Sequence, residues 1–187
     1  MKEVLTATDL YRAEFLQFER EVRGITPVWA QELRHSAMAR FTEMGFPTTH
    51  DEAWRHTSLD SLSECPFLLA RNLCDISKTE LKPVMSWMGA GCRLVFVNGS
   101  FSPLHSSLLP LPRGMKAGSI AGALGGESSL LESHLGRYAH CEDHTFAALN
   151  TAFLSDGAVL YLPPDTVVTE PLHLLFVSRP NGRATMS

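Results

Sequence analysis

The sequence predicts an α+β protein in which a helical first half is followed by the first coils of a β-solenoid. Apolar residues recur at helical spacing through the first half of the chain, whereas short apolar runs separated by prolines follow Gly157. A solenoid needs about three or more stacked repeats to bury its core, and the 187 residues end after only a few such runs. We therefore expect a truncated N-terminal part of a longer protein.

The composition favours a soluble globular protein, with 44% hydrophobic and 19% charged residues. A net charge of −4 argues against nucleic-acid binding, and no apolar run has the length of a signal peptide core or a membrane span. The cysteines are widely spaced and form no C-x-x-C pair, which favours reduced thiols; they are Cys65, Cys74, Cys92 and Cys141. We expect a cytoplasmic protein without nucleic-acid or membrane partners.

Two helices are predicted before residue 46. The first has an apolar stripe and ends at Gly24; the stripe consists of Tyr11, Phe15, Phe18 and Val22. The second should begin with Thr26 as N-cap and Pro27 at its first helical position, and should end at Gly45. Its apolar residues are Trp29, Leu33, Ala37 and Phe41.

The segment after Phe46-Pro47 should contain short helical turns. Thr49 or Asp51 is expected to cap a turn that holds Trp54. Candidate caps for another turn are Ser58 and Asp60. A third helix is predicted to begin near Ser77 and to include Leu81, Val84, Trp87 and Met88.

Strands are predicted after residue 93. Leu94–Val97 should form a strand, and Asn98-Gly99 is a strong hairpin-turn signal before Ser100-Phe101. Residues 102–126 are predicted to be mainly loop, and 127–154 mainly helical. The later strands are predicted at 158–162, 166–168 and 172–177, and the last, apolar on both faces, should be covered on both sides.

Three groups of residues are candidate chemical sites by composition. The first group consists of His50, Asp51, Glu52 and His56. Its adjacent acids Asp51 and Glu52 would point about 100° apart on a helix, so helix capping and solvated charge are favoured over metal binding. The second group consists of His134, His140, Cys141 and His144. His140 and His144 would converge on a helix but His134 and Cys141 would not, so metal binding is again disfavoured.

The third group is the glycine-rich run 118–129, GSIAGALGGESS. It lacks the lysine and spacing of a phosphate-binding loop, and a flexible loop is favoured. No G-x-S-x-G elbow is present. The sequence thus predicts no catalytic residue and no metal ligand, and it leaves any cofactor-binding residue unknown.

Three stretches carry a family resemblance. GFPTTHDEAWRHTSL at 45–59 follows a helix with Arg34 and Arg40, and RLVFVNGSFSP occupies 93–103. FAALNTAFLSDGAVLYLPPDTVVTEPLHLLFVS occupies 146–178. Together they resemble the N-terminal region of the SufD family, a non-ATPase component of the SUF iron–sulfur cluster assembly machinery within the SufB/SufD superfamily. His56 stands where that family more often has tyrosine.

The resemblance implies an N-terminal helical domain (1–92), a mixed strand–loop–helix connection (93–145) and the start of a right-handed parallel β-helix (146–187). The remaining coils, which pair with a SufB-like scaffold, and a C-terminal domain, which binds a SufC-like ATPase, would lie outside this sequence. The implied role is that of a non-catalytic scaffold. An iron–sulfur cluster would bind transiently to the whole complex, and no cofactor is expected in this fragment.

Other interpretations remain open. SufB is the alternative within the same system. A carbohydrate-active β-helix enzyme would need carboxylates along one face of the coils, and the acids in 146–178 are Asp156, Asp165 and Glu170. A stand-alone helical interaction module is the third possibility. Because an open stack exposes strand edges, we also expect poor solubility of the fragment.

Overall fold

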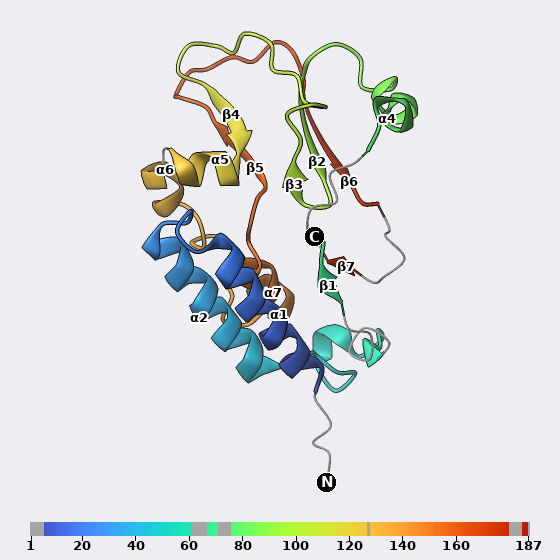
Figure 1. Cartoon of the computed structure of the whole chain (residues 1–187), viewed down its shortest axis with the longest axis vertical. Helices are drawn as coiled ribbons and strands as arrows, with labels where there is room; N and C mark the ends of the chain where they lie inside the picture. The colour runs from blue at the N-terminus through green and yellow to red at the C-terminus, as the bar shows by residue number, and fades with distance from the viewer. Residues whose placement is uncertain (1–5, 61–66, 71–75, 127, 180–184, 187) are drawn as a thin grey trace. The chain divides into compact units, whose positions relative to one another are not determined.

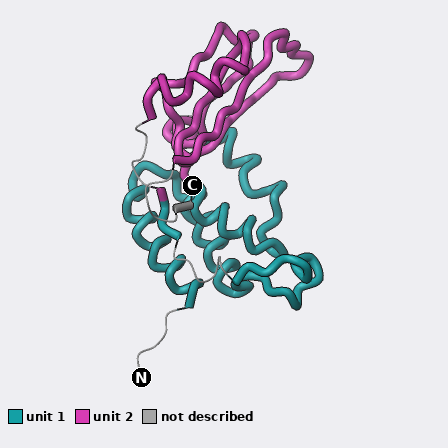
Figure 2. The backbone as a smooth tube through the Cα atoms, turned by 90° about the vertical axis from the view of Figure 1, so that its right-hand side faces the viewer, with its two compact units in different colours: residues 1–69, 127–154, 182–185 teal, residues 70–126, 155–181, 186–187 magenta. Residues whose placement is uncertain are grey.

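The computed structural model describes residues 6–60, 67–70, 76–126, 128–179 and 185–186 (Figure 1). The chain forms two compact units, each built from segments distant in sequence, which Figure 2 distinguishes by colour. Unit 1 comprises residues 1–69, 127–154 and 182–185, and unit 2 comprises 70–126, 155–181 and 186–187. The domain boundaries predicted at 92/93 and 145/146 stay a prediction.

Unit 1 is mainly helical. Its helices are α1 (Ala7–Val22), α2 (Val28–Met44), the 3-10 turn η1 (Glu52–Trp54), α6 (Ser128–Glu132) and α7 (Thr145–Ala152). The start of α1 is fixed by a capping box, in which the Thr6 hydroxyl accepts the Asp9 N–H and the Asp9 carboxylate accepts the Thr6 N–H. Gly24 follows α1 in the left-handed region, at φ 86°, as predicted for its end.

Helix α2 begins one residue later than predicted. Pro27, not Thr26, occupies the N-cap position, and its carbonyl accepts hydrogen bonds from the Ala30 and Gln31 N–H groups. The Thr26 hydroxyl is used elsewhere, because it donates to the Val22 carbonyl at 3.2 Å. The predicted end is confirmed: Gly45 has φ 67° and its N–H donates to the Phe41 carbonyl.

Aromatic rings form the core of unit 1. Phe15 and Phe18 of α1 are buried, and both rings pack on Phe153, which follows α7, with centroid distances of 5.9 and 5.8 Å. Phe41 of α2 is also fully buried and packs on Tyr11 at 5.8 Å. Burying one such ring contributes on the order of 1.5–3 kcal/mol, so these contacts are a major source of stability for the unit.

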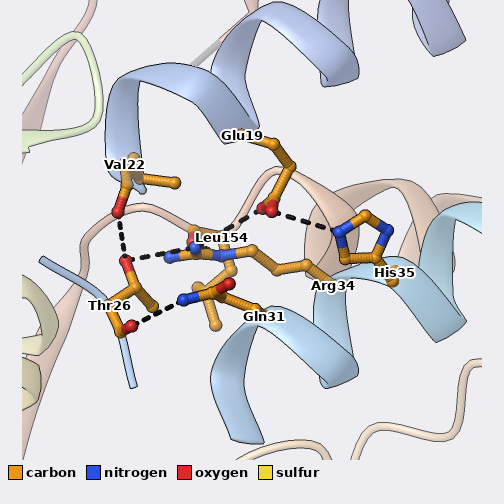
Figure 3. A network of polar contacts seen from close by, with 7 residues as sticks. All are labelled: Glu19, Val22, Thr26, Gln31, Arg34, His35 and Leu154. Carbon is orange, nitrogen blue, oxygen red and sulfur yellow. Dashed lines mark hydrogen bonds and ion pairs between the residues drawn. The ribbon is translucent and has the colours of Figure 1, made fainter. Parts of the chain in front are cut away.

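A buried arginine connects three segments of unit 1 (Figure 3). The Arg34 side chain is only 2% exposed, and its Nε donates to the Leu154 carbonyl at 2.8 Å. Its Nη1 lies 3.7 Å from a Glu19 carboxylate oxygen and donates to the Thr26 hydroxyl. Its guanidinium also lies 5.1 Å from the centre of the Phe18 ring. Burial lowers the pKa of Arg34, and Glu19 partly offsets that shift.

A second arginine of α2 binds the other side of α7. Arg40 donates from Nε and Nη2 to the Glu142 carbonyl, at 2.8 and 2.6 Å. Glu142 precedes α7 and Leu154 follows it, so two α2 arginines hold backbone carbonyls on both flanks of α7. Helices α2 and α7 therefore run antiparallel, since Arg34 binds the carbonyl after α7 and Arg40 binds the carbonyl before it.

Unit 2 contains two small sheets. In the first, β2 (Cys92–Val97) lies between β3 (Ser100–Phe101), which is antiparallel to it, and β6 (Leu172–Val177), which is parallel. In the second, β4 (Lys116–Ser119) pairs antiparallel with β5 (Ala158–Tyr161). The helices of the unit are α4 (Lys78–Met85) and α5 (Ile120–Gly125). Elsewhere, β1 (Leu68–Leu69) pairs with β7 (Thr185–Met186).

The predicted Asn-Gly hairpin is confirmed. Asn98 and Gly99 both have positive φ, at 48° and 80°, and join β2 to β3. Asn98 also links β2 to the end of β6: its N–H donates to the Val177 carbonyl, and its side-chain oxygen accepts the Arg179 N–H at 2.7 Å. One turn residue therefore closes the hairpin and extends the parallel pairing.

One face of the β2–β6 pair is covered by α4. Leu81 of α4 is buried against Val95 and Val97 of β2, and partly buried neighbours complete the cluster; they are Ile76, Met85, Leu175 and Val177. Ser77 is the N-cap of this helix, near the predicted start, but the helix ends at Met85, so Trp87 and Met88 lie outside it. Pro83 lies within this short helix, and turn hydrogen bonds follow it.

Other sequence predictions differ from the structure. Residues 102–115 are irregular as predicted, but β4 and α5 occupy 116–125 of the stretch predicted to be mainly loop. Residues 127–154 hold the two short helices α6 and α7 with turns between them. No strand forms at 166–168, where the Thr166 hydroxyl and N–H both donate to the Pro163 carbonyl and make a turn. None of the sheets in the described residues closes on itself, and the β-helix stays a prediction.

Removing the buried guanidinium should destabilise unit 1. Arg34→Met leaves the Glu19 carboxylate and the Leu154 carbonyl without this partner, so we expect the free energy of unfolding to fall by about 3–5 kcal/mol. Urea unfolding followed by circular dichroism measures this. Arg20→Met, at an exposed position on α1, is the matched control and should change it by less than about 0.5 kcal/mol. Equal stability of the two variants would contradict the prediction.

The capping box of α4 gives a pH-dependent contribution. The Ser77 backbone N–H and, next, its hydroxyl donate to Glu80 and lower the Glu80 pKa from its ordinary value of 4.5. The contact therefore stabilises the fold fully above about pH 4.5 and is lost as pH falls through the lowered pKa. In a carboxyl-carbon NMR titration, Ser77→Ala should raise the Glu80 pKa, whereas Ser86→Ala should not, because Ser86 bonds Pro83 instead.

Candidate functional site

The 50–56 group does not converge. Asp51 occupies the N-cap position of η1, but its carboxylate accepts from the Thr48 N–H and hydroxyl instead of capping that turn. Glu52 makes an exposed ion pair with Arg55 at 3.1 Å, and Arg55 Nε contacts the His56 ring at 2.9 Å. Glu52 thus carries the predicted solvated charge, whereas the predicted side-chain cap by Asp51 is wrong, because its carboxylate binds the preceding Thr48.

The 134–144 group is also dispersed. His144 is the N-cap residue of α7 and His140 precedes that helix, so the two do not share a helix, contrary to the prediction. His134 stacks on Tyr138, with Nδ1 2.8 Å from the hydroxyl, and Cys141 Sγ lies 3.4 Å from the Thr151 hydroxyl. No set of three or more His, Cys, Asp or Glu side chains in the described part of the chain is arranged to hold a metal ion.

The described residues of the glycine-rich run 118–129, which exclude 127, do not form a flexible loop, contrary to the prediction. Its first residues end β4, and Ser119 caps α5 by accepting the Gly122 N–H at 3.1 Å. Ile120 and Leu124, one helical turn apart, are buried. Burial of this apolar pair stabilises a helix in this segment despite its glycine content.

Asp156, an acid that the sequence suggested only for the rival enzyme interpretation, binds several backbone groups of unit 2. Its Oδ2 accepts the Phe101 N–H of β3 at 2.8 Å, and its Oδ1 accepts the N–H groups of Ala121 in α5 and Gly157. Three backbone groups from separate segments of unit 2 therefore meet on one side chain. Asp165, by contrast, lies in an exposed turn at φ 61°.

The β6 surface is the candidate interaction site of unit 2, and we define it as Leu172, Leu174 and Phe176. These residues alternate along one face of β6, where Leu174 is 42% and Phe176 60% exposed. The prediction that 172–177 is covered on both sides is therefore wrong for the described residues. The Phe176 ring stacks on buried Phe96 at 4.9 Å, so the exposed ring is held against the sheet.

The β6 surface continues into an apolar cavity of about 450 Å³. Leu172 and Cys92, which are register partners, both line it, together with the Leu109–Pro112 segment. Cys92 and Cys141 are free thiols, whereas Cys65 and Cys74 lie outside the described residues. The Cys92 sulfur accepts the Leu109 N–H at 3.2 Å, so it fixes the cavity wall.

The second edge of β6 has no strand partner among the described residues. Within the described strands, β2 is the neighbour of β6 on one side and no strand pairs with the other. An apolar face next to a free edge is a typical place for further strands or a partner to bind. None of the helices in the described residues is long and apolar enough to cross a membrane.

The Asp156 carboxylate should be important for the stability of unit 2. Asp156→Asn replaces one accepting oxygen by an NH₂ group, which faces backbone donors, so we expect a loss of about 1–3 kcal/mol in the free energy of unfolding. Chemical unfolding measures the change. Asp165→Asn is the matched control, because asparagine tolerates positive φ and Asp165 is exposed; it should be near neutral. Similar losses at both positions would refute the assigned role.

Comparisons with known proteins identify the family. The family model described as SufBD protein N-terminal region matches residues 6–174. The chain is 30% identical over 146 residues to the iron-sulfur cluster assembly SufBD family protein slr0076 of Synechocystis sp., covering 78% of this chain and 32% of that protein. It is 27% identical over 167 residues to the chloroplastic SufBD family protein ABCI8 of Arabidopsis thaliana, covering 80% and 29%.

A shorter match is 43% identical over 64 residues to the SufBD family protein ycf24 of Porphyra purpurea, covering 34% of this chain and 13% of that protein. The chain thus spans about a third or less of the length of these relatives. The predicted membership of the SufB/SufD superfamily is confirmed, because the family model covers most of the sequence. The chain belongs to the SufBD family and carries its N-terminal region.

Proposed function

We propose that this chain is the N-terminal part of a SufD-like scaffold that takes part in iron–sulfur cluster assembly. The family match over residues 6–174 carries the proposal, and the relatives it resembles are named as iron–sulfur cluster assembly proteins. SufD is favoured over SufB by the G-F-P-T and D-E-A-W-R motifs of 45–55. The proposed location is the cytoplasm.

The proposed role is binding rather than catalysis. In the rival interpretation, a carbohydrate-active enzyme, acids of the 146–178 segment would act on substrate. Asp156 is engaged by three backbone N–H groups, and Asp165 lies in a turn, which disfavours their use as an acid and base pair. The buried and charged groups of unit 1 are likewise engaged in packing, as Arg34 illustrates.

The β6 surface supports the proposal that further coils follow in the complete protein. β2 and β6 pair in parallel over six residues without a shift, the arrangement expected for successive rungs of a parallel β-helix. The exposed Leu174 and Phe176 would then face the interior of the coil stack, which later segments would fill. The complete protein is proposed to pair with a SufB-like scaffold and a SufC-like ATPase, and the complex to hold the cluster transiently.

The partners can be tested with the complete protein that contains this sequence. Co-expressed with tagged SufB-like and SufC-like proteins, it should be recovered with both in a stable complex on size-exclusion chromatography. Recovery with neither would overturn the proposed function. A complex that contains two copies of this protein but no SufC-like ATPase would instead support the interpretation as a stand-alone interaction module.

Two charge substitutions test whether the β6 surface, and not another part of unit 2, is needed for the complex. In the complete protein Phe176→Glu would place a carboxylate inside the proposed coil stack, so we expect loss of the complex. Val167→Glu is the matched control, because Val167 is 76% exposed in a nearby turn segment, and its complex should be retained. Retention with both variants would contradict the proposed stacking on β6.

A further inference from the structure

An aromatic pocket lies in unit 1 beside the start of α7. Phe46, Trp54 and Phe146 line this cavity of about 480 Å³. The Phe146 ring is flanked by the other two, with centroid distances of 6.1 Å to Phe46 and 5.4 Å to Trp54. All three rings are half-buried, so they present aromatic surface that neighbouring side chains leave accessible.

The charges of the pocket have one sign. Asp51, Glu52 and Asp143 line it, and none of its lining residues is lysine or arginine. The Asp51 carboxylate is bonded to Thr48 and Glu52 pairs with Arg55, whereas no hydrogen bond or ion pair joins Asp143 to another described residue. The one other titratable lining residue is His144.

The pocket is held in shape by contacts from α2. Arg40 binds the Glu142 carbonyl through two nitrogens, which fixes the backbone immediately before Asp143. Trp54 ends η1, whose start is fixed by the Asp51–Thr48 bonds. The rings and the backbone that carries the carboxylates are therefore preorganised, which reduces the ordering that binding would require.

We propose that this pocket binds a lysine or arginine side chain presented by another polypeptide. Aromatic faces attract cations and pack against the methylene groups of these side chains, and the carboxylates supply a complementary charge. Phosphate-bearing partners such as nucleic acids are disfavoured by the same negative charge. A bare metal ion is disfavoured because aromatic rings supply no ligand atoms.

The proposal can be tested on the 187-residue chain by NMR. The probes are the N-acetyl, N-methylamide derivatives of arginine, lysine and uncharged norleucine. The Trp54 indole N–H, assigned from the spectrum of Trp54→Phe, should shift saturably with the two cationic probes and little with norleucine. Trp87, which is 91% exposed, is the internal reference and should shift no more than an open surface indole. Added salt should weaken the binding.

Removing one charge from the pocket should weaken the affinity. We expect Asp143→Asn to raise the dissociation constant about two- to fivefold, in line with an exposed ion pair. Glu132→Gln, which removes a charge from exposed α6, should leave it unchanged. If Asp143→Asn alters the amide spectrum broadly, Glu52→Gln gives the same test at an 85% exposed side chain. Equal shifts with norleucine, or equal affinity of the pocket and control variants, would overturn the proposal.

Discussion

The helical unit depends on two arginines of α2 that bind backbone carbonyls on either side of α7. Arg34 reaches Leu154 from a buried position and Arg40 reaches Glu142 from a more exposed one. A guanidinium is suited to this task because its donors lie in a fixed plane and it remains charged when buried. These bonds set where α7 lies along α2, and this placement in turn brings Phe153 onto α1 and Phe146 beside Trp54.

The β2–β6 pair has two different faces, and this difference determines where the chain can bind another element. On one face α4 covers Val95 and Val97, whereas on the other the Phe176 ring lies on Phe96 and remains largely exposed. Asp156 fixes the neighbouring segments by bonding β3 and α5. On that second face the β2 residues Leu94 and Phe96 are buried and the β6 residues remain exposed, so the β6 side is suited to binding by strand addition or stacking.

The sequence allowed prediction of features that depend on neighbouring residues. The Asn98-Gly99 turn, the end of α2 at Gly45 and the strand at 172–177 each follow from local backbone preferences. Features that depend on distant contacts were missed. Thr26 was predicted to cap α2, but its hydroxyl donates to the Val22 carbonyl and accepts from Arg34. The exposure of one face of β6 depends on which other segments pack on it, and the sequence of the strand does not reveal them. The aromatic pocket unites residues nearly a hundred positions apart, for which no local pattern exists.

The register of the parallel pair has a consequence for synthesis on the ribosome. Cys92 of β2 is paired with Leu172 of β6, a separation of 80 residues. At about 5–20 residues per second, β2 waits roughly 4–16 seconds for this neighbour to be translated. Until then the edge of β2 that will pair with β6 lacks that strand, because β3 pairs with the opposite edge. Nascent chains of this protein therefore pass through an interval in which a very apolar strand edge is open to chaperones or to other nascent chains.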